Sequence, residues 1–84
     1  MAKLTAHVDL AKTDNGAILL NSRTGAYWEV NDTGRHIIEA LIESGSREAA
    51  AQAIVEKFDV SLEQAEADIK KIVEELSEAG LLTE

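Results

Sequence analysis

The sequence predicts a single α+β domain, residues 1–84, in which a three-stranded antiparallel meander is followed by three helices. Short segments before residue 31 alternate or run apolar between turn residues, whereas later segments repeat apolar residues at helical spacing. At 84 residues the chain has room for one modest core. Since three short strands are not stable alone in water, one face of the sheet must pack on the helices.

Residues 6–30 are expected to form the sheet. Residues 7–12 alternate between apolar and polar side chains, as a half-buried strand does. The Asp-Asn-Gly sequence at 14–16 predicts a tight hairpin turn, because Asn and Gly accept positive φ angles. Residues 17–21 supply the second strand. Residues 1–5, before the first strand, are expected to be frayed.

The third strand, Ala26 to Val30, follows a Gly-containing turn and holds two of the chain's three aromatic residues. Alternation places Ala26, Trp28 and Val30 on the face that we expect to pack on the core. Tyr27 and Glu29 then lie on the other face. Two short turns put the first and third strands at the edges of the sheet.

Residues 31–82 are expected to form three helices. Each begins after a residue whose side-chain oxygen can accept a hydrogen bond from a free N–H of the first turn. Gln64, three residues after Ser61, also predicts a capping box. The three caps and helices are Asn31 with Asp32–Ser44, Ser46 with Arg47–Phe58, and Ser61 with a helix that reaches about Ala79.

The net charge of −8 belongs entirely to the helical part. Residues 1–30 carry three basic and three acidic residues, whereas residues 31–84 carry five basic and thirteen acidic residues. Such a surface repels nucleic acid and acidic membranes and attracts basic peptides, although a merely solvated acidic surface is the commoner case. Without a membrane-spanning run or a signal peptide, a cytoplasmic location with no membrane partner is expected.

No catalytic, metal or cofactor site is predicted. His7 and His36 lie on different elements without a partner at ligand spacing, and the chain has no Cys. The acidic residues of the third helix suit a solvated face, because nothing provides a nucleophile with a base and an orienting group. The glycines stand alone at turns and form no phosphate loop. We therefore expect a protein that is not an enzyme.

A sheet with three helices also permits a winged helix-turn-helix that binds DNA. That function needs a basic recognition helix, yet the second helix offers only Arg47 and Lys57, and the third carries six acidic residues against two lysines. The open edge of the third strand is a better candidate, because an extended peptide can complete it by adding a strand. Peptide binding is favoured. The alternatives are DNA binding, a generic interaction domain, and an edge covered by the third helix or a partner subunit.

The segment from Gly25 to Gly34, followed by Ile37, resembles the G-x-Y-x-x-L-N-x-T-G-x-x-I signature of the PqqD-like family. Members of this family are recognition elements for ribosomally made, post-translationally modified peptides. Further similar positions, spread over nearly the whole chain, are the Asn15-Gly16 turn, Leu19-Leu20, Phe58-Asp59-Val60, Asp68, Leu76 and the closing Gly80-Leu81-Leu82.

The adjacent Tyr27 and Trp28, together with the length, are most similar to the stand-alone leader-binding protein of lasso-peptide pathways. Three positions depart from the family pattern: Val30 replaces the usual Leu, Ile38 stands where Trp is common, and Asn21 stands where Asp is common. These changes are conservative for the core.

The resemblance implies a non-catalytic protein that holds the leader of a precursor peptide and presents it to maturation enzymes. In lasso-peptide pathways the implied partners are a leader peptidase and an ATP-dependent cyclase resembling asparagine synthetase. The leader would pair with the edge of the third strand and lie against the third helix. The implied leader-binding residues are Ala26, Tyr27, Trp28, Glu29, Val30, Asp68, Ile69, Lys71, Ile72, Glu75 and Leu76.

Overall fold

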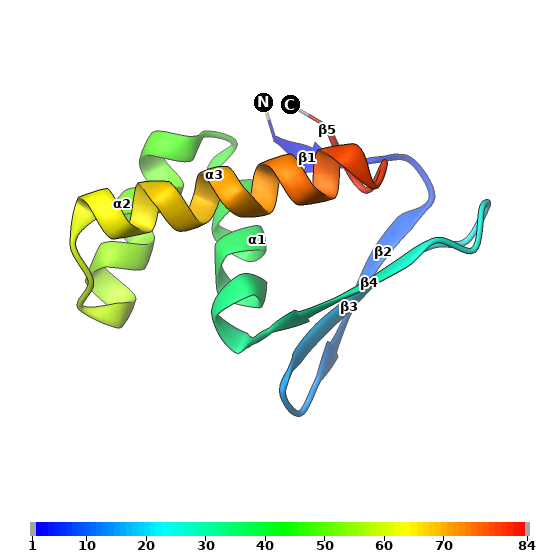
Figure 1. The fold of residues 1–84 in the computed structure, drawn as a ribbon, viewed down its shortest axis with the longest axis horizontal. Coiled ribbons are helices and arrows are strands. Elements are labelled where there is room, and N and C mark those ends of the chain that lie inside the picture. The colour runs from blue at the N-terminus through cyan, green and yellow to red at the C-terminus, as the bar shows by residue number, and fades with distance from the viewer. Residues whose placement is uncertain (1, 84) are drawn as a thin grey trace.

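The chain folds into the predicted α+β architecture in a computed structural model that describes residues 2–83 (Figure 1). One antiparallel sheet consists, in order, of β2 (Val8–Thr13), β3 (Gly16–Asn21) and β4 (Tyr27–Asn31). The helices that follow are α1 (Asp32–Ser44), α2 (Arg47–Phe58) and α3 (Leu62–Glu78). The predicted fold class is confirmed, as are the edge positions of the first and third strands of this meander.

Side-chain caps explain where the first two helices begin. The Gly34 N–H donates to Asn31 Oδ1 at 2.8 Å, at the junction of β4 with α1. Ser46 Oγ accepts from the Ala49 N–H at 3.1 Å at the start of α2. Gly45, with a φ of 75°, ends α1 in the left-handed conformation that glycine adopts without strain. The predicted bounds of both helices are confirmed.

Helix α3 begins after Ser61, whose Oγ accepts from the Gln64 N–H at 3.0 Å. The predicted capping box is only half formed. The Gln64 side-chain amide donates to Asp68 Oδ1 at 2.8 Å, and among the described residues it makes no bond to the Ser61 backbone. The helix ends at Glu78, with Ala79 as its C-cap.

The hairpin between β2 and β3 needs its glycine for space rather than for a special φ. Neither Asn15 nor Gly16 has a positive φ, contrary to the reason for which the turn was predicted. Gly16 lies opposite Asn31, and a Cβ on Gly16 would overlap the Val30 carbonyl oxygen. The absent side chain therefore lets the end of β4 lie close against β3.

The start of the chain is paired rather than frayed, so that prediction is wrong. Strands β1 (Lys3–Leu4) and β5 (Leu82–Thr83) form a second, two-stranded antiparallel sheet. Ala2 is 4% exposed, and residue 1 lies outside the described residues. His7, expected as the first residue of the first strand, instead sits in a turn with a φ of 70°, and β2 begins at Val8.

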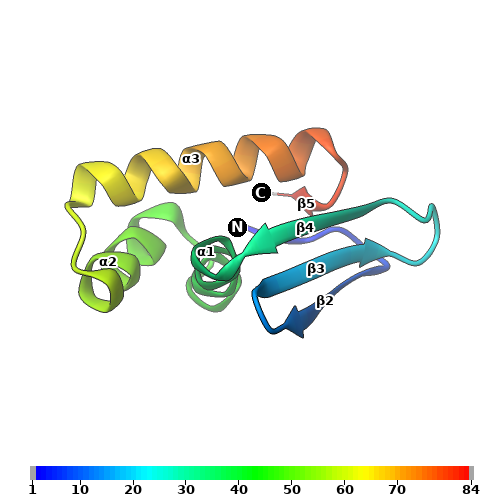
Figure 2. The same cartoon turned by 60° about the horizontal axis from the view of Figure 1, so that its bottom comes forward.

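The core lies between the inner face of the sheet and the helices. Within the three-stranded sheet, β4 is the strand nearest α3, and β2 lies on the far side (Figure 2). Among residues 2–83, no helix combines the length and apolar character needed to cross a membrane. The largest fully buried side chains are Leu19, Ile37, Ile38, Leu41, Ile69, Leu76 and Leu81.

Candidate binding groove

A bulge at the start of β4 sets the register of its pairing with β3. The Gly25 N–H donates to the Asn21 carbonyl and the Asn21 N–H donates to the Ala26 carbonyl, both at 2.8 Å. Two residues of one strand thus face one residue of the other, and Gly25, with a φ of 80°, takes the left-handed position that such a bulge requires. Asn21 also holds this turn with its side chain, since its Oδ1 accepts from the Arg23 N–H at 2.9 Å.

This register decides which backbone groups of β4 are free. Antiparallel partners alternate between hydrogen-bonded and non-hydrogen-bonded pairs. Because the bonded pairing starts at Ala26, the N–H and C=O groups of Trp28 and Val30 point to β3. Those of Tyr27 and Glu29 therefore point to the open edge. Among the described residues β4 pairs with β3 alone, so this edge is not covered by another strand.

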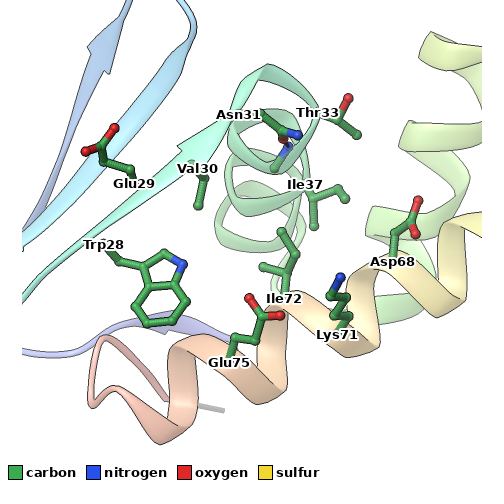
Figure 3. Close-up of a pocket in the computed structure, with 11 residues that line it drawn as sticks. Trp28, Glu29, Val30, Asn31, Thr33, Ile37, Asp68, Lys71, Ile72 and Glu75 are labelled. Atoms are coloured by element: carbon green, nitrogen blue, oxygen red, sulfur yellow. Dashed lines mark hydrogen bonds between the residues drawn. The ribbon is translucent and has the colours of Figure 1, made fainter.

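The open edge of β4 borders a groove of about 390 Å³ whose opposite wall is α3 (Figure 3). The end of β4 and the first turn of α1 close one side, and one face of the middle of α3 closes the other. In Figure 3, Trp28 points toward α3, whereas Glu29 points away from it. The lining residues are Trp28, Glu29, Val30, Asn31, Thr33, Gly34, Ile37, Asp68, Lys71, Ile72 and Glu75.

Gly34 lets the floor of the groove form. It is buried at the start of α1, where a Cβ would lie 3.1 Å from Val30 Cβ and 3.3 Å from Ile72 Cδ1. A side chain here would push apart the three elements that meet at this point. Ile37, one turn further along α1, is 1% exposed and forms the base below Gly34.

Trp28 lies on the predicted face of β4, but it is not buried. Its side chain is on the α3 side of the sheet, and 37% of the residue remains exposed. It therefore forms a wall of the groove rather than part of the core. Tyr27, on the outer face, is 61% exposed.

Seven of the eleven predicted site residues line this groove: Trp28, Glu29, Val30, Asp68, Lys71, Ile72 and Glu75. Two others, Ile69 and Leu76, are each 1% exposed and belong to the core, so they do not line the groove. They share the apolar stripe of α3 with Ile72, but only Ile72 reaches the rim. Ala26 and Tyr27 are exposed but do not line the groove.

Four lining residues were not predicted as site residues: Asn31, Thr33, Gly34 and Ile37. All four belong to the signature segment that carries the family resemblance. Their positions in that signature could have identified them as site residues, but each also has a structural explanation, as a helix cap, a residue of the first turn or a core residue. They lie beside the groove because α1 begins there, directly after β4.

The charged residues at the rim come mainly from α3. Asp68 and Glu75 are half-buried, and Lys71 is exposed between them. Asp68 accepts the hydrogen bond from Gln64, which holds its carboxylate in place. Two carboxylates against one ammonium give this rim an excess of negative charge, which favours basic side chains in a ligand.

A separate ionic cluster lies along α1. The Arg35 guanidinium binds Asp32 at 2.9 Å and Glu39 at 3.0 Å. The hydrogen bond from Arg35 lowers the pKa of Asp32, and the hydrogen bond to Asp32 raises the pKa of Arg35. His36 packs edge-on against Phe58, with 5.2 Å between ring centroids. Within residues 2–83, no group of three or more His, Asp or Glu side chains is placed to hold a metal ion.

Comparison with known proteins gives matches over most of the chain. The family model described as coenzyme PQQ synthesis protein D (PqqD) matches residues 16–82. A solved structure described as lasso peptide synthetase B1 complexed with the leader peptide is 34% identical, with a TM-score of 0.86, and the match covers 99% of this chain and 98% of that one. TbiB1 in complex with the TbiA(beta) leader peptide is 28% identical, with a TM-score of 0.81 and coverage of 95% and 93%. No curated protein gives a significant match.

Proposed function

The chain belongs to the PqqD family, and from this membership and the groove we propose that it binds the leader of a ribosomally made precursor peptide. The leader adds a strand to the open edge of β4 and lies in the groove against α3. The bound precursor is then presented to the enzymes that mature it, in the biosynthesis of a lasso peptide. The protein itself performs no chemistry in this proposal.

The free edge beside the groove is the observation that carries the proposal. Tyr27 and Glu29 direct their unpaired N–H and C=O groups toward a space whose opposite wall is α3. An extended peptide can satisfy these groups while Trp28 and Ile72 contact its side chains. Main-chain bonds then supply affinity, and side-chain contacts select the sequence.

The solved relatives support the same class of ligand. Both matched proteins are described in complex with a leader peptide, and each match spans nearly the full length of both chains. A match of this extent includes the sheet and the helices that form the two walls of the groove. We infer that a leader peptide is the ligand of this chain as well.

The proposal includes further partners that follow from the pathway class. A leader peptidase and an ATP-dependent cyclase would act on the presented precursor, and the encounter would take place in the cytoplasm, where ribosomes make the precursor. Neighbouring reading frames test this directly. A short precursor encoded beside a peptidase and a cyclase supports the lasso-peptide assignment, whereas a different set of modifying enzymes redirects it to another class of modified peptide.

Binding and delivery are tested together with the precursor encoded beside the protein. A fluorescently labelled leader is titrated with the protein, and cleavage of the whole precursor by the peptidase is timed with and without it. We expect nanomolar to micromolar affinity, since ordering a flexible leader offsets part of the contact energy. We also expect faster cleavage when the protein is present. Absence of binding at about 100 μM protein, far above this range, would contradict the proposal.

DNA binding gains no support from the structure. Helix α3 presents carboxylates beside the groove, and phosphate contacts require basic residues in such positions. A duplex that bound at micromolar protein and physiological salt would overturn this assessment.

A further inference from the structure

The outer face of the sheet, opposite the groove, carries an exposed apolar pair. Leu20 on β3 is 46% exposed and Tyr27 on β4 is 61% exposed. The two residues are direct partners in the ladder. Theirs is a non-hydrogen-bonded pair, whose Cα atoms lie about 4.5 Å apart, so the side chains are close neighbours. Together they form an apolar surface that reaches the open edge of β4.

Glu29 continues this outer face two residues along β4. Its side chain points away from α3, on the same face as Tyr27. Within the described part of the chain its carboxylate makes no ion pair. The outer face therefore presents an apolar position and an unpaired carboxylate next to each other, both directly beside the free edge.

The backbone geometry links these side chains to the peptide. Tyr27 and Glu29 are the residues whose N–H and C=O groups point to the open edge, so an added strand bonds to these two residues. In either strand direction, the peptide residues opposite them project their side chains to the same face of the sheet. The peptide residue between them projects to the other face, toward Trp28 and α3.

We propose that the leader is recognised on both faces of the sheet, and that Tyr27 with Leu20 and Glu29 form two outer subsites. The Tyr27 subsite takes an apolar or aromatic residue, and the Glu29 subsite takes Lys or Arg. The two peptide residues are spaced i and i+2, and the residue between them enters the groove. This inference rests on the proposed function and specifies which peptides the same edge accepts.

A peptide is the occupant that the geometry favours over another protein surface. The apolar pair is continuous with the edge that the added strand completes, so any strand bonded there must cover part of Tyr27. Leu20 lies one strand further in and bounds the subsite on its inner side. A long apolar side chain opposite Tyr27 buries surface on both residues, which adds affinity that depends on its size.

Peptide display tests both subsites and does not require the sequence of the precursor. A library of random twelve-residue peptides, a length of about 40 Å when extended, is selected against the parent protein, against Glu29→Lys and against Asp9→Lys. Asp9 is the matched control, because it lies on the same outer face but on β2, opposite Leu20 and away from the open edge. All three proteins are checked for the parent's circular dichroism and melting behaviour.

We expect the parent to enrich an apolar residue and a basic residue two positions apart. With Glu29→Lys the basic preference should change to acidic or disappear, while the apolar position and the intervening groove position stay the same. Asp9→Lys should enrich the parent pattern. An unchanged preference with Glu29→Lys would overturn the outer-subsite inference and leave the proposed function standing. Failure of all three proteins to enrich any peptide would overturn both.

A second measurement isolates the apolar subsite. The best peptide from the parent selection is compared with its variant carrying Ser at the apolar position, against the parent and Tyr27→Ser. The Ser peptide should bind the parent about ten-fold more weakly, and this difference should shrink to less than two-fold with Tyr27→Ser. An equal loss against both proteins would show that the peptide side chain does not contact Tyr27, and the inference would be wrong.

Discussion

The sheet has two open edges with the same backbone chemistry and different surroundings. On β2, the hairpin pairing of Thr13 with Gly16 leaves the N–H and C=O groups of Leu10 and Lys12 directed outward. On β4, the corresponding groups are those of Tyr27 and Glu29. The Lys12 ammonium reaches 4.0 Å from Glu39 on α1, and β2 lies on the far side of the sheet from α3. Of these two edge strands, only β4 runs beside the α3 wall.

The difference shows what turns a strand edge into a specific site. Unpaired backbone groups alone accept any extended chain, and proteins commonly guard such edges with a charge, as Lys12 does on β2. A wall opposite the edge makes binding selective, because the side chains of the added strand then contact residues at fixed positions on that wall. On β4 that wall includes Ile72 and the rim carboxylates of Asp68 and Glu75. The edge gives affinity and the wall gives selectivity.

Proline substitution should give the largest difference in leader affinity between the two edges. Glu29→Pro removes an outward N–H of β4, and Lys12→Pro removes the equivalent N–H of β2. We expect leader affinity to fall about 100-fold for Glu29→Pro, or roughly 2–3 kcal/mol, since the peptide carbonyl opposite is left unsatisfied. Lys12→Pro should bind like the parent.

Glu29→Gln is the control for loss of the carboxylate in that experiment, and it should weaken binding much less than Glu29→Pro does, because it keeps the outward N–H. Calorimetric titration with the precursor leader measures all four proteins. Equal losses for both proline variants would mean that the leader does not use β4 selectively.

Truncation of the wall should have the next largest effect. Ile72→Ala removes apolar surface from the groove, and we expect binding to weaken by about 1–2 kcal/mol, or roughly 5- to 30-fold. Leu62→Ala is the matched control, because Leu62 is an exposed apolar residue at the start of α3 that does not line the groove. If Leu62→Ala weakened binding as much as Ile72→Ala did, the groove would not be the docking site.

Trp28→Ala should affect both stability and binding to a moderate extent. Truncation of a fully buried Trp costs about 3–5 kcal/mol, but Trp28 is 37% exposed, so we expect a loss of about 1–2 kcal/mol. Chemical unfolding measures this loss. Trp28 is also the only Trp in the chain, so leader binding should shift its fluorescence to shorter wavelength. A destabilisation above about 4 kcal/mol would place Trp28 in the core after all.

Raising the salt concentration should produce the smallest change in leader affinity. The acidic excess at the groove favours a basic leader, so raising NaCl from 50 to 300 mM should weaken binding about two- to five-fold. Titrations at several salt concentrations measure the slope. Charge reversal at Asp68 should flatten it. Tighter binding at high salt would mean that Lys71, rather than the carboxylates, dominates the encounter.

Much of the fold could be predicted because local signals agree with the global structure. The caps at Asn31 and Ser46 fix helix starts through hydrogen bonds to residues three positions away, so short sequence patterns contain the necessary information. The pair β1–β5 could not be predicted in this way. Its strands have two residues each, too short for a periodicity, and they are joined by the tertiary placement of the chain ends.

The sequence predicted which strand and helix border the candidate site, but not which of their side chains line it. Ile69, Ile72 and Leu76 lie on one apolar stripe of α3, and the sequence has no feature that separates the rim from the core. That distinction depends on how closely α1 approaches α3, and the absence of a side chain at Gly34 leaves room for this approach. Likewise, Trp28 was assigned to the correct face, but its exposure depends on the space between β4 and α3.

Hydrogen exchange at single-amide resolution tests the central claim most directly. Before the leader is added, the amides of Trp28 and Val30 should already be protected by β3, whereas those of Tyr27 and Glu29 should exchange quickly. Saturating leader should slow exchange at Tyr27 and Glu29 by at least ten-fold, roughly the protection expected from one newly formed hydrogen bond. The outward amide of Lys12 on β2 should not change. Protection that appears on β2 or only on α2, with Tyr27 and Glu29 unaffected, would contradict strand addition at β4.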